Sequence, residues 1–400
     1  VWPTHPAFAD RFMAHRFPME QCWFGYFSDI PNGNISDHGT HTLGTMAGLI
    51  EETNDTIGVA FKSYWIANDF VTSTVEALPP LTDMIAAFEW ALNPDGDINT
   101  TDDIPDVINN SWRWRDDPDT VQCGGFVVNL MNAIEAAGIA NVFSGGNSGP
   151  SNSTVNAPQR INTSEVNTFC VGSVNGNSAF PYPISNFSTR GPSQCPTDGS
   201  NLSLEIHPEV VAPGQNVRSA WGTDEFNTIS GTSMAAPHVS GAILLLKEAF
   251  PYLSGEDLLW ALYQTAVDLG DVGEDNVYGM GIIDVYAAYL QLAQTNTPVD
   301  PNVVPWDLAI TGAADPTGNG ITCEDAFSTT VTFANWGDNT ITDINFAYDI
   351  NGAGTQNQTW SGSLAPGQTE TIVLSNANTS EFGELGLNVL ATISGQSEEY

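Results

Sequence analysis

Residues 231–238 read Gly-Thr-Ser-Met-Ala-Ala-Pro-His and open a segment with the spacing of an α-helix. Ser233 therefore stands at a helix start, with a glycine two residues before it and small residues after it. The N-terminus of a helix favours negative charge beside its free backbone amides. This segment alone is also typical of an ordinary N-cap, so its meaning depends on what the rest of the chain supplies.

Two upstream segments supply complementary chemistry. His38 opens another predicted helix, whose later positions Gly44, Ala47 and Gly48 are small and allow close packing. An imidazole that is neutral near pH 7 suits a general base. Residues 144–150, Ser-Gly-Gly-Asn-Ser-Gly-Pro, form a loop in which the amide of Asn147 is a neutral donor suited to a developing oxyanion.

The three segments support one another because they occur together, although each has an ordinary explanation when taken singly. A single histidine is more often structural than catalytic, and a Gly-Gly-Asn loop is usually a turn. We interpret His41 and His238 as structural residues. His238 follows Ser233 by five residues on the same predicted helix, so it cannot easily fold back to act as its base.

Short apolar strands alternate with helical patterns through residue 293. Strands are predicted at 107–109 and 140–144, and apolar residues recur at helical spacing from Val127 to Ala137. Further helical patterns follow His38, Leu81, Ser233 and Glu256. This alternation predicts an α/β fold with a mostly parallel sheet and helices on both faces. The site is then expected beyond the carboxyl ends of the strands.

The composition changes near residue 295. Residues 295–305 hold three prolines and are predicted to form a linker. Beyond it the apolar period is two, at 344–350 and at 385–393, with turn residues between the segments. We predict an α/β domain over 1–294 and an all-β, Ig-like sandwich over 306–400 that carries no catalytic constellation.

On these residues the chain resembles the subtilisin-like serine peptidases, and within them the secreted bacillopeptidase-F-like enzymes. The His38 segment, the Asn147 loop and Gly-Thr-Ser-Met-Ala match the family in order and separation over about residues 1–293. The resemblance implies that Ser233 attacks the scissile carbonyl and that His38 takes and returns the proton. It also implies that the Asn147 side chain and the Ser233 amide hold the oxyanion.

The resemblance further implies the substrate-binding residues. Ser111-Trp112-Arg113 matches the strand edge that pairs with extended substrate, and Ser144-Gly145-Gly146 matches the opposite wall of the pocket. The family usually has glycine where this chain has Arg113, which is followed by Trp114 and Arg115. Two of only nine basic residues thus lie beside the expected cleft, where they either favour acidic or large substrate side chains or face solvent.

The family's catalytic aspartate has no counterpart at its expected place. Residues 1–6, Val-Trp-Pro-Thr-His-Pro, match the end of the family's aspartate segment, so we expect the aspartate three residues before Val1. Asp37 adjoins His38, but neighbouring side chains at a helix start point apart, and Asp10 and Asp29 match no motif. We therefore expect an N-terminally truncated fragment that lacks the catalytic Asp strand and is poorly active alone.

The composition excludes several other classes of protein. The chain has 47 acidic and 9 basic residues and a net charge of −38, which disfavours nucleic acid and anionic membrane surfaces as partners. No apolar run approaches the length of a transmembrane helix. We expect a secreted, acidic, monomeric enzyme that acts on protein or peptide substrates, with its signal peptide removed or outside this sequence.

The sequence does not assign the disulfide pairing or any metal site. The five cysteines are widely spaced and form no Cys-x-x-Cys pair, which disfavours a zinc site and allows one or two disulfides with at least one thiol left over. Cys170 lies in an apolar run and is interpreted as a buried thiol. The chemistry requires no cofactor. The family often binds structural Ca²⁺, but no loop of this chain is specific enough to assign as a metal site.

Two alternatives compete with a serine endopeptidase. A catalytically inactive relative that acts as a binding module would be expected to lose at least one of His38, Asn147 and Ser233, and all three are present. An α/β-hydrolase esterase needs Gly-x-Ser-x-Gly and a histidine far beyond the serine, whereas Ser233 is followed by Met234 and no histidine lies beyond His238. The endopeptidase is therefore favoured.

Overall fold

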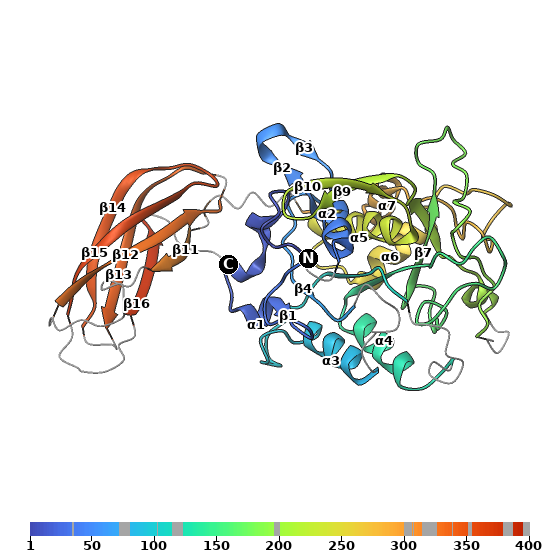
Figure 1. Ribbon diagram of the computed structural model, residues 1–400, viewed down its shortest axis with the longest axis horizontal. Helices are drawn as coiled ribbons and strands as arrows, with labels where there is room; N and C mark the ends of the chain where they lie inside the picture. Colours follow the sequence, from blue (N-terminus) through green and yellow to red (C-terminus); the bar gives the residue numbers. More distant parts are fainter. Residues whose placement is uncertain are drawn as a thin grey trace. The chain divides into compact units, whose positions relative to one another are not determined.

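The computed structural model describes residues 1–33, 36–71, 81–101, 103–113, 123–195, 201–299, 306, 308–313, 326–337, 339–350, 354–378 and 387–394. The chain divides into two compact units, Val1–Asp300 and Pro301–Tyr400. Figure 1 shows helices and strands mixed in the first unit and strands in the second.

A four-stranded parallel sheet lies within the first unit. Its strands follow the order β5 (Val107–Asn110), β6 (Ala140–Ser144), β7 (Phe169–Val174) and β8 (Val210–Pro213). Every residue of β6 and β7 is buried, as expected for strands that are covered on both faces. The strands predicted over 107–109 and 140–144 are confirmed.

Helices cover both faces of this sheet. One buried apolar cluster joins Val142 of β6 to helices α5, α6 and α7, and another joins Phe143 to α3 and α4. Successive residues of a strand point to opposite faces, so these two side chains mark the two sides. The predicted α/β class is confirmed. The helices are α3 (Leu81–Ala91), α4 (Phe126–Ala136), α5 (Thr232–Ala249), α6 (Gly255–Gln264) and α7 (Val285–Leu292).

Helix α2 (His38–Ala47) packs against α5 and against strand β9 (Val217–Trp221) (Figure 1). A Cβ on Gly44 would stand 2.8 Å from the Cβ of Ala220, closer than real Cβ atoms approach. Only glycine therefore allows the helix to lie at this depth. The close packing predicted from the small residues of this helix is confirmed.

The other elements of the first unit are short. Strands β1 and β4 pair in parallel, whereas β2 with β3 and β9 with β10 pair antiparallel. Their bounds are η1 (Ala9–Arg11), η2 (Met13–His15), α1 (Met19–Cys22), β1 (Trp23–Phe24), β2 (Leu49–Ile50), η3 (Glu51–Thr53), β3 (Asp55–Thr56), β4 (Ala67–Asn68), η5 (Leu202–Glu205) and β10 (Glu225–Ile229).

The second unit contains two three-stranded antiparallel sheets, ordered β11–β12–β15 and β14–β13–β16. Phe333 of β12 and Phe346 of β13 meet with ring centroids 5.3 Å apart inside one buried apolar cluster, so the two sheets share a core. The strands are β11 (Leu308–Ala313), β12 (Ala326–Asn335), β13 (Ile341–Ile350), β14 (Gln356–Leu364), β15 (Thr369–Asn378) and β16 (Leu387–Ile393).

Part of the predicted linker, residues 300–305, lies outside the described residues. The preceding residues are attached to the first unit. The backbone N–H of Val299 donates to the carbonyl of Ala249 at 2.8 Å, and the Tyr252 hydroxyl donates to the carbonyl of Thr297 at 2.7 Å.

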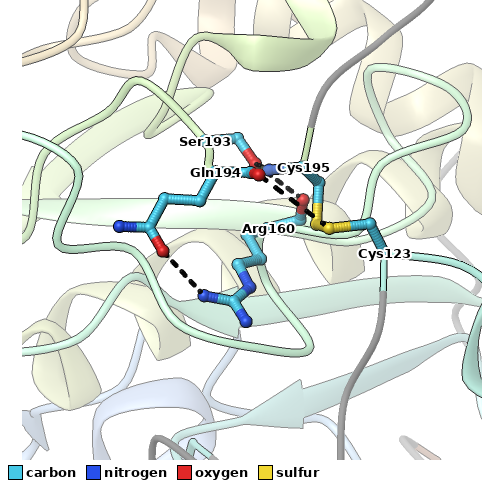
Figure 2. The surroundings of a disulfide bond; sticks show 5 residues. All are labelled: Cys123, Arg160, Ser193, Gln194 and Cys195. Atoms are coloured by element: carbon cyan, nitrogen blue, oxygen red, sulfur yellow. Dashed lines mark hydrogen bonds between the residues drawn. A yellow bond between two sulfur atoms is a disulfide. The ribbon is translucent and has the colours of Figure 1, made fainter. Parts of the chain in front are cut away.

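A disulfide joins Cys123, just before α4, to Cys195 in the loop after β7 (Figure 2). The Ser193 hydroxyl donates to the carbonyl of Arg160 at 2.9 Å and accepts from the backbone N–H of Cys195 at 3.0 Å, so the backbone beside the second cysteine is fixed. A disulfide that spans 72 residues stabilises the fold, typically by about 2–4 kcal/mol, because it restricts the unfolded chain.

Three cysteines are not part of this disulfide. Cys22 and Cys170 are free and buried, as predicted for Cys170. Cys323 lies outside the described residues. Within the described part of the chain, none of the helices is both long enough and apolar enough to span a bilayer.

Candidate active site

The predicted site residues gather at the carboxyl edge of the parallel sheet. Ser111 follows β5, and Asn147 follows β6 by three residues. The N-terminus of α5 reaches the same edge, because the Ser111 hydroxyl donates to the carbonyl of Ser233 at 3.0 Å. The position predicted for the site, beyond the carboxyl ends of the strands, holds for these three residues.

The Asn147 loop is tied directly to the start of α5. The side-chain oxygen of Asn147 accepts from both the backbone N–H and the hydroxyl of Thr232, each at 3.0 Å. The backbone N–H of Gly146 in turn donates to the Thr232 hydroxyl at 3.0 Å. These two bonds to the side-chain oxygen fix the orientation of the Asn147 amide. The Nδ2 group therefore points away from Thr232.

Two nitrogen donors lie near one point beside Ser233. A Cβ built on Gly231 would lie 3.3 Å from Asn147 Nδ2 and 3.7 Å from the backbone nitrogen of Ser233. Ser233 is the second residue of α5, so its N–H has no acceptor within the helix. The absence of a side chain at Gly231 leaves this point open to an acceptor atom.

Proline inside α5 explains why Ser111 bonds to Ser233. In an α-helix the N–H of residue 237 would donate to the carbonyl of residue 233. Pro237 has no N–H, so the Ser233 carbonyl takes its hydrogen bond from Ser111 instead. The Ser111 hydroxyl is itself held by Asn109 Nδ2, at 3.0 Å. The strand edge is thus joined to the residue at the helix start.

We expect Ser111→Ala to lower the free energy of unfolding by about 1 kcal/mol, because the Ser233 carbonyl loses its donor. In a Pro237→Ala background the loss should shrink, since the N–H of residue 237 then supplies the helical bond. Urea unfolding of the four chains in a Ser233→Ala background measures this coupling. Equal losses in both backgrounds would show that the Ser111 bond does not substitute for the helical one.

The two predicted substrate-binding walls are bridged by a residue that the sequence did not indicate. The side-chain amide of Gln159 donates to the carbonyls of Trp112 and Ser144, each at 2.8 Å. Gly145 and Gly146 are buried, and the N–H of Gly145 donates to the carbonyl of Val171 at 2.8 Å. Gln159 and these backbone bonds hold the walls at a set separation.

Trp112 and Arg113 take different positions in the first wall. The Trp112 ring packs edge-on against Phe70 and Phe143, so its side chain belongs to the apolar core. The Arg113 Cδ lies 3.9 Å from where a Cβ on Gly146 would stand, so its side chain reaches toward the opposite wall. Trp114 and Arg115 lie outside the described residues.

His38 is the first residue of α2 and is partly buried. Burial lowers its pKa below the usual value of 6.5, which favours the neutral imidazole that a general base requires. Asp37, the residue before His38, accepts at Oδ1 from Trp2 Nε1 at 2.6 Å. Among the described residues, no carboxylate is hydrogen-bonded to the His38 imidazole.

His41 and His238 have the structural roles that were predicted. The His41 Nε2–H donates to the carbonyls of Val217 and Asn227 at 3.1 and 3.2 Å, which joins α2 to the β9–β10 hairpin. The His238 Nδ1–H donates to the carbonyl of Met234 at 2.8 Å, one turn back along α5.

His41 makes stability dependent on pH. Burial, its largest cause, lowers the pKa of His41 to about 4, and the buried Nδ1 has no acceptor for a second proton. In the unfolded chain the pKa is about 6.5, so the unfolded state binds more protons below that pH. We expect the contribution of His41 to be complete above pH 6.5 and to be lost as the pH falls toward 4, by at most about 3 kcal/mol.

Urea unfolding at pH 7 and pH 4.5 checks this expectation. His41→Gln, compared with the parent in a Ser233→Ala background, should show a smaller loss of stability between the two values. The other groups titrate in both chains, so the difference between the chains isolates His41. An identical loss in the two chains would contradict it.

Sequence reasoning missed three residues that position the site: Thr232, Gln159 and Asn109. Each acts through a side-chain hydrogen bond to a residue at least two positions and up to 85 positions away. Thr232 lies inside the Gly-Thr-Ser motif, which was a signal for its importance. No local pattern distinguishes Gln159 or Asn109 from other polar residues beside strands.

Comparisons with known proteins match the first unit. The model of the family described as "Subtilase family" matches residues 3–281 of this chain. Bacillopeptidase F of Bacillus subtilis (strain 168) is 35% identical over 266 residues, which are 63% of this chain and 17% of that protein. Subtilisin DY of Bacillus licheniformis is 30% identical over 263 residues, which are 64% of this chain and 79% of that protein. The chain thus spans a small part of the first relative and most of the second.

A solved structure agrees with the fold. Sphericase has a TM-score of 0.54 and 24% sequence identity, and the match covers 71% of this chain and 88% of that one. This likeness concerns the α/β architecture.

Proposed function

The chain belongs to the subtilase family, and on that premise we propose that it is a serine endopeptidase that hydrolyses peptide bonds in proteins or peptides. Ser233 Oγ attacks the scissile carbonyl carbon and loses its proton to His38. The tetrahedral intermediate collapses to an acyl-enzyme as His38 gives that proton to the leaving amine. Water, deprotonated by the same histidine, then releases the acyl group.

The convergence of donors beside Ser233 carries this proposal. Negative charge develops on the carbonyl oxygen during the attack, and donors fixed in advance stabilise it without reorganisation. Asn147 Nδ2 and the Ser233 amide nitrogen both lie within 3.7 Å of the point that a Cβ on Gly231 would occupy. The bonds of Thr232 to the Asn147 oxygen keep the donor aimed there.

Substrate selection is proposed to follow from the two walls. Ser111-Trp112-Arg113 and Ser144-Gly145-Gly146 would pair with extended substrate backbone on either side. Because Arg113 reaches toward Gly146, we propose that its guanidinium favours acidic or large side chains next to the scissile bond.

We further propose an extracellular location for the protein and a role for its second unit. The disulfide between Cys123 and Cys195 and the acidic composition fit an extracellular protein. The two sheets of residues 306–400 fit an Ig-like sandwich that acts as a spacer or surface anchor.

Hydrolysis of casein and of short p-nitrophenyl esters, with parallel fluorophosphonate labelling, tests the proposal. An endopeptidase cleaves casein and is labelled, an esterase cleaves only the esters, and an inactive relative does neither. The full chain should be used. Absence of both casein cleavage and labelling would favour the binding-module alternative.

A further inference from the structure

A second cluster of reactive side chains lies at the opposite edge of the parallel sheet. Cys170 is the second residue of β7, and His207 and Glu209 lie just before β8. β7 and β8 pair in parallel with Val171 opposite Val210, which places Cys170 beside Glu209. This is the amino end of the strands, whereas Ser111 and Asn147 follow the carboxyl ends.

The three side chains present three kinds of ligand atom to one another. The Cys170 sulfur, a His207 ring nitrogen and a Glu209 carboxylate oxygen all lie within 4.8 Å of one another. The His207 Nδ1 stands 3.2 Å from Glu209 Oε1. The exposed fractions are 0% for Cys170 and His207 and 2% for Glu209, so water does not reach the cluster from outside.

His207 contacts the Glu209 carboxylate through Nδ1 but lacks the hydrogen bonds that a buried histidine normally makes. Neither ring nitrogen makes a hydrogen bond within the described chain, although the residue is fully buried. Leaving a buried polar atom unpaired costs about 1–3 kcal/mol, so such atoms are usually satisfied. A buried imidazole without a hydrogen bond, beside a thiol and a carboxylate, offers a set of ligand atoms suited to a metal ion.

The other contacts of the cluster hold the carboxylate in place. Glu209 Oε2 accepts from the backbone N–H of Cys170 at 2.9 Å, and Asn162 Nδ2 donates to Glu209 Oε1. The backbone N–H of Glu209 donates to the carbonyl of Cys170 at 3.0 Å. Outer hydrogen bonds of this kind orient metal ligands in proteins.

We propose that Cys170, His207 and Glu209 bind one Zn²⁺ as a structural site that joins β7 to the segment before β8. Thiolate, imidazole and carboxylate are the ligands that Zn²⁺ takes in proteins, whereas Ca²⁺ and Mg²⁺ take oxygen. A thiolate and a carboxylate carry two negative charges, so a divalent ion leaves the buried site neutral. The three side chains supply three positions of the tetrahedron, and a water enclosed with the ion completes it.

The test uses the full chain without a histidine tag, in a Ser233→Ala background that prevents self-digestion. After dialysis against Zn²⁺ and gel filtration, elemental analysis should find one zinc per chain. Replacement by Co²⁺ should give a thiolate-to-cobalt charge-transfer band. A wild-type cluster that retains no zinc and gives no such band would overturn the proposal, and would identify the cluster as a plain His–Glu ion pair beside a thiol.

Matched variants locate the ion. Cys170→Val and His207→Gln should each lose the zinc and the cobalt band. Cys22→Val, which changes the other described buried free thiol, should keep both. 1,10-Phenanthroline, which removes zinc and leaves calcium, should lower the melting temperature of the parent but not of Cys170→Val. A cobalt band that persists in Cys170→Val would overturn the assignment. The proposal is independent of the peptidase function, since every chain tested lacks Ser233.

Discussion

Ser233→Ala should abolish hydrolysis of peptide substrates by the full protein and prevent labelling by fluorophosphonates. The substitution removes the atom proposed to form the covalent acyl intermediate, while the α5 backbone with its proposed oxyanion amide stays in place. In a subtilisin the equivalent loss costs about 10⁶-fold in kcat, and we expect a decrease of that order here.

The measurement compares kcat on a chromogenic peptide and the labelled band in parent and variant. Ser363→Ala, which changes an exposed serine of the second unit, should keep both signals and controls for non-specific labelling. Circular dichroism should show that Ser233→Ala is folded. Labelling that survives in a folded Ser233→Ala chain would refute the assignment of the nucleophile.

Asn147→Ala should decrease kcat by about 10²–10³-fold and leave KM nearly unchanged, a magnitude that is known for a subtilisin. In the proposed role the Nδ2 group donates to charge that is present mainly in the transition state, so its loss slows turnover more than it weakens binding. If Asn147→Ala instead raised KM at constant kcat, the residue would be a ground-state binder.

Thr232→Val should impair the Asn147 Nδ2 donor less than Asn147→Ala does. It removes the hydroxyl that holds the Asn147 oxygen and accepts from Gly146, but it leaves the Nδ2 group in the site. We expect a decrease in kcat of about tenfold, because the donor is present but less well aimed. A Thr232→Val chain as slow as Asn147→Ala would mean that the loop collapses without this hydroxyl. Thr232→Ser, which keeps the hydroxyl, should restore the parent rate.

Local patterns are sufficient for the elements that carry the site. The helices after His38 and Ser233 and the strand over 140–144 follow from apolar periodicity, because a residue's place on a helix or strand face depends on near neighbours in the chain. The family motifs likewise lie on short segments. For this reason the amino-acid sequence alone identifies Ser233, His38 and Asn147 as candidates.

Contacts between distant segments do not follow from such patterns. Ser111 bonds to the Ser233 carbonyl across 122 positions, and Pro237 leaves that carbonyl without its usual helical donor. The partner of Cys123 could not be chosen among the other cysteines, since pairing depends on which loops the fold brings together. The spacing of residues along the chain does not indicate which distant segments come into contact in the fold.

The cluster of Cys170, His207 and Glu209 shows the same limit most clearly. Thirty-seven positions separate Cys170 from His207 (207 − 170), and the absence of a Cys-x-x-Cys pair disfavoured zinc. The parallel pairing of β7 with β8 then sets Cys170 beside Glu209. That register is a property of the paired strands in the folded sheet, not of either segment by itself. Apolar runs therefore predict single strands such as 140–144, whereas the chemistry between two strands is established by the folded sheet.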